Sequence, residues 1–193
     1  MFTKEEEKLF LEYSLENEKN LRISINAGLS FNILRKTIIQ KFVNSLDENL
    51  RNELGKLGDS WKIYNDISDN VFVRWKGMYV HKSEWNENYY IGFVSEFNNA
   101  KGFILGVSKN SDNTPTIPGL IDVINSRYKI GKSSSRWIWY QWLDHHYLNW
   151  DKEEVLILMN QSNNNDALKY FVQNIMNLVY ISSDIIDEHI KKS

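Results

Sequence analysis

Cysteine is absent from this 193-residue sequence, and proline occurs only twice. Without cysteine there are no disulfides, no thiolate ligands for a metal and no cysteine nucleophile. Long apolar runs are missing too, since no stretch approaches the roughly 20 residues that a membrane-spanning helix needs. The acidic start of the chain, MFTKEEEKLF, lacks the basic segment and apolar run of a signal peptide. We therefore expect a cytoplasmic protein that has no membrane partner.

The chain also lacks a strong charge of either sign. Its formal net charge is −2, whereas a protein that coats nucleic acid needs a strongly positive field. The charge is unevenly spread, because residues 1–19 sum to −3, residues 20–150 to +4 and residues 151–193 to −3. A mildly basic middle therefore lies between two acidic ends, and this contrast is too small to identify a partner.

Apolar and aromatic residues are abundant by contrast. Hydrophobic residues make up 42% of the chain, which includes seven Trp, ten Tyr and nine Phe. This content is enough to fill a sizeable core, and together with the low net charge it excludes a disordered chain. The sequence therefore predicts a single α+β domain over residues 1–193.

Helical patterns begin at the N-terminus. Thr3 followed by Glu6 is a capping box, which predicts a helix over residues 4–18. The next segment, residues 21–27, is ambiguous and is interpreted as a short extended link that ends at Gly28.

A second helix is predicted over residues 31–56, with Ser30 as its N-cap and with Gly55 and Gly58 ending it. Its apolar side chains recur every four residues, which places them on one face. They are Leu34, Ile38, Phe42, Leu46, Leu50 and Leu54.

Five short aromatic and β-branched segments follow, separated by turn residues. They read WKIYN, VFVRWKG, MYVHKSEW, YYIGFVSEF and GFILGVSKN. In the fourth segment Tyr90 and Val94 alternate with Ile91 and Phe93, as expected of a strand with two different faces. These segments predict an antiparallel, aromatic-rich meander of four or five strands over residues 61–109.

The C-terminal part, residues 117–191, is predicted to be mainly helical. It contains a short amphipathic helix at 119–128, a capping box of Asp151 and Glu154, and a long amphipathic helix over about 166–191. The spacing of two tryptophans in SSRWIWYQW suggests an extended stretch there. Four tryptophans are interpreted as core residues, with interface anchors as the alternative: Trp137, Trp139, Trp142 and Trp150. The fold class is α+β, a four- to five-stranded meander flanked by N-terminal and C-terminal amphipathic helices.

Bulky residues recur in one pattern from about residue 31 to residue 189. The pattern comprises FNILRKTIIQKFVNSL, Trp61 before the strands, HKSEWNENYYIGFVSEF with GFILGVS, then SSRWIWYQW, Trp150 and the closing helix ALKYFVQNIMNLV. In this pattern the chain resembles the C-terminal accessory region of bacterial and phage PD-(D/E)XK nuclease-like proteins. In that family an Asp and a (D/E)-x-K pair, which lie N-terminal to the matching region, hold a divalent metal and position the attacking water.

The metal-binding motif of that family is missing here. The only E-x-K is Glu6–Lys8, within the first predicted helix. The best strand counterpart, Arg74–Trp75–Lys76, has an arginine where a carboxylate is needed. The resemblance therefore implies the accessory half of such a nuclease, or a descendant without its active site. We predict no catalytic residue, no metal ligand and no cofactor.

Two short motifs contain residue types of metal-binding and phosphate-binding sites without the pattern that such sites need. His145 and His146 are adjacent, whereas metal-binding histidines on one helix are spaced by four. The segment Gly131–Lys132–Ser133 resembles the end of a P-loop, but Ser126 occupies the position of the first P-loop glycine. Neither motif predicts a site.

Two sets of residues are candidate binding sites. The first combines rings and cations expected on the strands, as in proteins that bind single strands on an open sheet. This partner-binding set is Phe72, Arg74, Lys76, Lys82 and Trp85. The second lies in a segment without acidic residues, and this anion-binding set is Arg127, Lys129, Lys132 and Arg136. A polar outer sheet face and a solvated loop, respectively, are the alternative interpretations.

The leading hypothesis is a non-catalytic binding module of bacterial or phage origin in phage–host conflict. Its partner would be a protein, such as a nuclease or a CRISPR-type effector, or a nucleic acid. One alternative is a diverged metal-dependent nuclease. Its candidate residues are the carboxylates Glu84, Glu96 and Asp112 and the cations Lys82 and Lys101. The other alternative is a phage-encoded inhibitor of a host defence nuclease that acts by direct protein contact.

Overall fold

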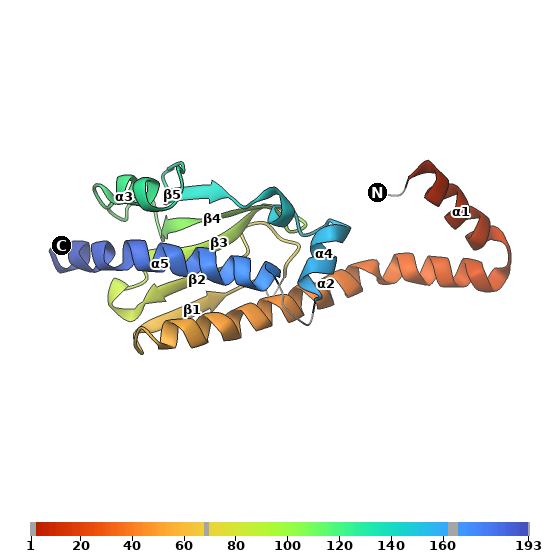
Figure 1. The fold of residues 1–193 in the computed structure, drawn as a ribbon, viewed down its shortest axis with the longest axis horizontal. Coiled ribbons are helices and arrows are strands. Elements are labelled where there is room, and N and C mark those ends of the chain that lie inside the picture. The colour runs from red at the N-terminus through yellow and green to blue at the C-terminus, as the bar shows by residue number, and fades with distance from the viewer. Residues whose placement is uncertain (1–2, 68–69, 162–165, 193) are drawn as a thin grey trace. The chain divides into compact units, whose positions relative to one another are not determined.

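The computed structural model describes residues 3–67, 70–161 and 166–192. The chain divides into two compact units, residues 1–37 and residues 38–193. The α+β architecture predicted for the whole chain belongs to the second unit, whereas the described part of the first unit consists of helices and the turn between them (Figure 1).

The first unit contains helix α1 (Lys4–Leu15) and the beginning of helix α2 (Glu18–Gly55). The predicted capping box at the start of α1 is confirmed. Thr3 Oγ1 accepts a hydrogen bond from the backbone N–H of Glu6 at 3.2 Å, and the Glu6 carboxylate accepts one from the backbone N–H of Thr3 at 2.8 Å. These two bonds satisfy donors that a helix start leaves free.

The predicted extended link at residues 21–27 is wrong, because these residues lie inside α2. The chain turns earlier, where Asn17 Oδ1 accepts a hydrogen bond from the backbone N–H of Asn20 at 2.9 Å. Asparagine is a strong N-cap, so the helix begins directly after it and not after Ser30. Gly28 is an interior helical glycine, which lowers helix stability by roughly 1 kcal/mol relative to alanine without breaking the helix.

The second unit holds a five-stranded antiparallel sheet, as the sequence predicts. The strands lie side by side in chain order: β1 (Trp61–Asn65), β2 (Gly77–Lys82), β3 (Tyr89–Phe97), β4 (Lys101–Lys109) and β5 (Trp137–Trp142). Four of them come from the predicted meander, and β5 comes from the C-terminal part that was expected to be mainly helical.

The strand predicted for VFVRWKG does not form. Residues 71–76 make turns and a bend, and Trp75 has a φ angle of 65°. This left-handed conformation is incompatible with a strand, so the side chains of the segment do not alternate between two faces.

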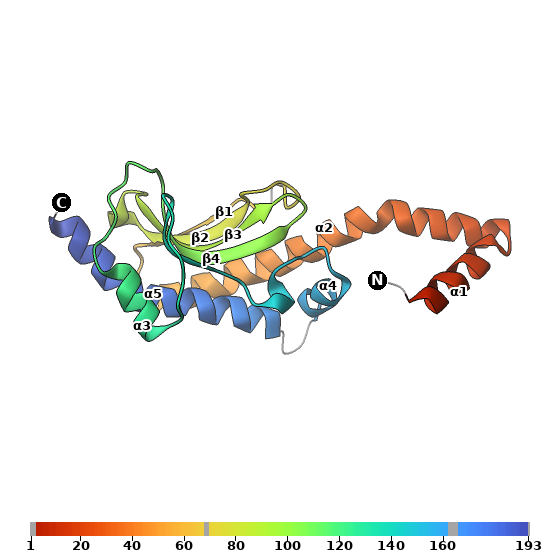
Figure 2. The ribbon, with the colours of Figure 1, turned by 90° about the horizontal axis from the view of Figure 1, so that it is seen from above.

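Helices lie along one face of the sheet (Figures 1 and 2). They are α2 from residue 38 onward, α3 (Leu120–Arg127), α4 (Glu153–Met159) and α5 (Asp166–Lys192), with the short 3₁₀ turns η1 (Ser83–Trp85) and η2 (His145–Tyr147) at the loops. The predicted apolar stripe of α2 is buried at Phe42, Leu46, Leu50 and Leu54. Among the described residues, no helix is both long and apolar enough to cross a membrane.

The second predicted capping box is wrong. Helix α4 has Lys152 at its N-cap position, without a side-chain hydrogen bond to the helix. Asp151 instead forms an ion pair with Lys101 at 2.7 Å, which ties the start of β4 to the turn before α4. This tertiary ion pair is not visible in the local sequence pattern.

Candidate binding site on the open face of the sheet

The sheet face opposite the helices carries its own set of side chains. In β2, Met78 and Val80 belong to the main core, whereas Tyr79 packs with Val94 and Ile104 in a separate, smaller cluster. Strand alternation explains this division, since successive side chains point to opposite faces. The helices of the second unit lie on the Met78 side, so within this unit the Tyr79 side is an open face (Figure 2).

A β-bulge brings one tryptophan onto this open face. Val107 lies opposite Trp139 and Ser108 lies opposite Trp137, so Ile138 is an extra residue on β5. Trp139 is therefore fully buried in the main core, while Trp137 joins the open-face cluster. Trp137 and Trp139 therefore pack on different faces of the sheet, because the bulge reverses the alternation between them.

Two paired glycines, Gly92 and Gly106, lie at the centre of the open face. Across the strands, Tyr79 lies opposite Gly92, Gly92 opposite Gly106, and Gly106 opposite Tyr140. The glycines leave room for neighbouring rings, because a Cβ atom at Gly106 would lie 2.8 Å from the ring of Trp137.

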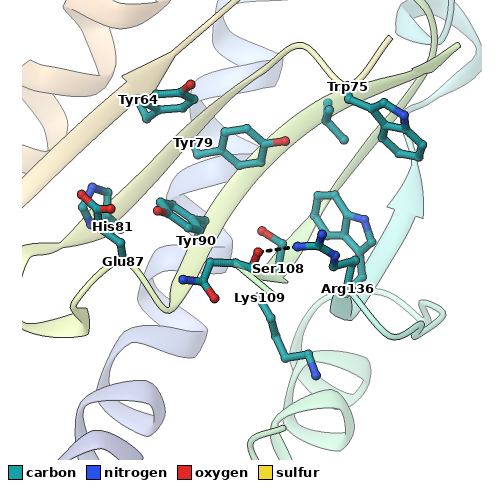
Figure 3. Close-up of a pocket in the computed structure, with 12 residues that line it drawn as sticks. Tyr64, Trp75, Tyr79, His81, Glu87, Tyr90, Ser108, Lys109 and Arg136 are labelled. Atoms are coloured by element: carbon teal, nitrogen blue, oxygen red, sulfur yellow. Dashed lines mark hydrogen bonds between the residues drawn. The ribbon is translucent and has the colours of Figure 1, made fainter. Parts of the chain in front are cut away.

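A pocket of about 660 Å³ lies on the open face. This volume lies within the range of small-molecule sites, about 300–1,000 Å³. Aromatic rings from five elements line it: Tyr64 on β1, Trp75 in the turn before β2, Tyr79 on β2, Tyr90 on β3 and Trp137 on β5. Figure 3 shows the first four of these rings. His81, Glu87, Ser108 and Arg136 add polar groups to the lining. The pocket therefore combines many rings with a few polar side chains.

The tyrosine rings form a connected row. The ring centroids of Tyr79 and Tyr90 are 5.9 Å apart, those of Tyr64 and Tyr79 are 6.4 Å apart, and the imidazole of His81 lies 5.1 Å from Tyr90. Burial, with a smaller contribution from Asp66, raises the pKa of Tyr79 well above its ordinary value. Its hydroxyl therefore stays protonated and can donate a hydrogen bond to a ligand.

One guanidinium lies at the rim of the pocket. Arg136 donates a hydrogen bond to the backbone carbonyl of Asn110 (Figure 3) and forms an ion pair with Asp112 at 3.1 Å. Both side chains of this ion pair are more than half exposed, so water screens it and it contributes little to stability. The guanidinium is therefore held at the rim while remaining accessible to an anionic group.

The predicted partner-binding set does not form one surface. Phe72 packs against the main core, and Lys76 forms a partly buried ion pair with Asp66 at 3.3 Å. Arg74 is exposed and lies over the ring of Trp75 at 5.8 Å. Of this segment only Trp75, which the prediction omitted, lines the pocket.

Lys82 and Trp85, the other two members of that set, have structural contacts. Trp85 is fully buried and its Nε1 donates to Asp187 Oδ1 at 2.7 Å. Lys82 Nζ lies 2.5 Å from Asp187 Oδ2 and 5.3 Å from the ring centroid of Trp61. The three side chains fasten the C-terminal end of α5 to the loop between β2 and β3.

We expect Asp187→Ala to lower the free energy of unfolding by about 2–3 kcal/mol, because it leaves a buried indole N–H and a partly buried ammonium without their shared acceptor. Asp187→Asn keeps an oxygen for the indole and should cost less. Urea denaturation measures both losses. Asp184→Ala, at an exposed position of the same helix, is the control and should change stability by less than about 0.5 kcal/mol. Equal stability of all three variants would contradict a fastening role.

The anion-binding set is divided between two places. Arg127 is exposed in the last turn of α3, and Lys129 forms an ion pair with Asp144 at 3.8 Å. Lys132 pairs through its backbone with Tyr140 on β5, which places it beside the open face together with Arg136. Of these four residues, Arg136 is the one that lines the aromatic pocket.

The carboxylates considered for a nuclease are separated. Glu84 lies in η1 before β3, whereas Glu96 lies near the other end of β3, roughly 20 Å further along at 3.3 Å per residue. Asp112 is paired with Arg136. Within residues 3–67, 70–161 and 166–192, no three His, Asp or Glu side chains are grouped so that they could hold a metal ion.

Comparison with known proteins leaves the pocket without a precedent to draw on. No protein-family model, curated protein or solved structure matches this chain. The interpretation of the site therefore depends on its own geometry and chemistry.

Sequence reasoning identified part of this face. The alternation of YYIGFVSEF correctly separates Tyr90 and Val94 from Ile91 and Phe93. It did not select Tyr64, Tyr79 or the bulged tryptophan, because their common location depends on strand register. An alternating reading of MYVHK, with a tyrosine and a histidine on one side, was the available signal.

Proposed function

We propose that the protein is a non-catalytic binding module that holds unpaired nucleobases on the open face of its sheet. The observation that carries this proposal is the pocket on the open face of the sheet, which aromatic rings from five elements line. Base stacking on aromatic side chains of an exposed sheet is a common mode of single-strand binding.

The rings at the edge of the pocket are accessible to a base. Tyr64 is 53% exposed and Trp75 is 49% exposed, so a planar group can contact them without displacing core residues. Stacking contributes about 1–3 kcal/mol per base and does not depend on base identity. The Tyr79 hydroxyl and the His81 ring add hydrogen-bonding groups to the lining of the pocket.

The cations beside the rings fit a ligand that also carries phosphate. Arg136 lies at the rim of the pocket, and Lys132 pairs through its backbone with Tyr140 on β5. Arg74 is exposed near Trp75. Since Glu87 and Asp112 balance part of this charge, we expect stacking to dominate and the phosphate contribution to be modest.

The test is a titration of the full-length protein with short single-stranded DNA and RNA oligonucleotides, followed by tryptophan fluorescence. We expect Tyr64→Ala and Tyr90→Ala each to weaken binding at least about fivefold, the equivalent of 1 kcal/mol. Arg136→Ala should remove about one phosphate contact. The slope of the logarithm of the binding constant against the logarithm of the salt concentration should therefore decrease in magnitude by about 1.

Three comparisons make this test decisive. Tyr180→Ala, on α5, removes a tyrosine that is 58% exposed and should leave binding unchanged. A duplex of the same sequence should bind less tightly than the single strand, because its bases are already stacked, and a free mononucleotide shows whether the backbone contributes. Equal affinity of Tyr64→Ala, Tyr90→Ala and the unmodified protein would overturn the proposal.

The proposal is compatible with the resemblance to nuclease accessory regions, in which a non-catalytic part would engage nucleic acid for a separate catalytic part. That resemblance and the setting in phage–host conflict stay predictions. Recovery of a nuclease bound to the chain, by a surface other than the aromatic pocket, would favour the inhibitor hypothesis.

A further inference from the structure

Exposed apolar side chains are concentrated in the first unit. Of the described residues between 9 and 34, twelve large apolar side chains are 39–73% exposed. They are Leu9, Phe10, Leu11, Tyr13, Leu15, Leu21, Ile23, Ile25, Leu29, Phe31, Ile33 and Leu34. With side chains of roughly 150–200 Å² each, they expose an apolar surface on the order of 1,000 Å², more than monomers usually leave open.

Few side chains of these helices are buried, namely Ser14, Asn20 and Arg35 among residues 3–37. In α1 only Ser14 is buried, and its hydroxyl lies 2.8 Å from that of Ser24 near the turn. A 12-residue helix is marginally stable in water without a packed face. In the start of α2, Leu21, Ile25, Leu29 and Ile33 recur every four residues and form a stripe along one side. Both helices therefore present faces suited to packing against other helices.

The two helices carry opposite charge. Residues 4–16 contain two lysines and five glutamates, a net charge of −3. Residues 18–37 contain one glutamate and four basic residues, a net charge of +3, with Lys19, Arg22 and Lys36 exposed and Arg35 buried. An acidic apolar helix and a basic apolar helix on one chain are complementary to the same pair on a second copy.

We propose that residues 4–37 form a homodimerisation surface, in which the helical pair of one copy packs against that of a second copy as a four-helix bundle. A two-fold arrangement places each acidic α1 against the basic start of the other copy's α2. The exposed apolar area matches the roughly 800 Å² per partner that a standard interface buries. The unit's net charge of zero gives no attraction to anionic lipid or nucleic acid. This surface is separate from the aromatic pocket, so the inference does not depend on base binding.

Sedimentation equilibrium of the full chain at micromolar concentration tests the proposal, and we expect a dimer. Ile25→Glu combined with Leu29→Glu places two charges on the apolar stripe and should shift the protein to monomer. Asn26→Glu combined with Ser30→Glu adds the same charges at neighbouring exposed positions and should leave the dimer intact. Circular dichroism checks that the sheet-containing unit stays folded in both. A monomeric unmodified protein, or an unchanged dimer in the first variant, overturns the proposal.

Charge reversal separates pairing between copies from any contact within one. Glu5→Lys, Glu7→Lys and Glu12→Lys together make both helices of a chain basic, with +3 on each. Lys19→Glu, Arg22→Glu and Lys36→Glu together make both acidic, with −3 on each. Each variant alone should be monomeric, and an equimolar mixture should form heterodimers. A mixture that stays monomeric excludes the charge-matched bundle.

Discussion

Gly92→Ala is expected to lower the free energy of unfolding by about 3 kcal/mol or more, one of the largest effects of any single-methyl addition in the sheet. A Cβ atom at this position would lie 2.0 Å from the carbonyl oxygen of Met78 and 2.7 Å from the Cα of Tyr79. Both contacts are with the backbone of the neighbouring strand, which cannot move aside as a flexible side chain can. The substitution must therefore separate β2 from β3 or distort the backbone of the sheet at this position.

Gly55→Ala is the matched control, because a Cβ there has no atom within 4 Å. It should leave stability unchanged or raise it by about 0.4–1 kcal/mol, as the unfolded chain loses freedom. Urea denaturation of both variants gives the two values. Equal stability of Gly92→Ala and the unmodified protein would contradict the close approach of β2 and β3 at Gly92.

Trp150→Ala is expected to cost about 3–5 kcal/mol, the range for removing a buried indole. Trp150 is fully buried and its ring stacks on Phe103 with centroids 4.1 Å apart. Phe42 from α2, Phe93 from β3 and Phe171 from α5 surround it at 5.7–5.8 Å. Its Nε1 also donates to the backbone carbonyl of Tyr147 at 3.0 Å. Truncation of Trp150 to alanine would therefore leave a cavity that adjoins both the sheet and two helices.

The matched control is Trp142→Ala, which removes an indole that is 42% exposed and stacks on Phe97. We expect a loss of less than about 1.5 kcal/mol, since stacked pairs contribute about 0.5–1.5 kcal/mol and little core area is lost. The unfolding midpoint in urea and the near-ultraviolet circular dichroism report both changes. Similar losses for the two variants would show that Trp150 is not the centre of the core.

Elements with a strong local pattern were predictable. The four-residue spacing in α2 and the alternation in β3 depend only on which residues are apolar, and both were confirmed at Phe42, Leu46, Ile91 and Phe93. The start of α2 was not predicted, because Gly28 suggested a break in the helix, whereas the side chain of Asn17 caps a helix that begins earlier. The cap at Asn17 and the glycine at position 28 are local signals of similar strength for where the helix begins. The helix continues through the glycine because adding a residue to an existing helix costs less than starting a new one.

The candidate site depended on tertiary structure. Composition and periodicity determined an α+β protein with an aromatic antiparallel sheet, no disulfide and no sequence motif for catalysis. Which rings meet was decided by strand register, by the bulge that turns Trp137 away from Trp139, and by the pairing of Gly92 with Gly106. Side-chain period fixes the two faces of each strand, but only pairing between distant strands places residues beside one another, so the pocket became visible in the folded chain alone.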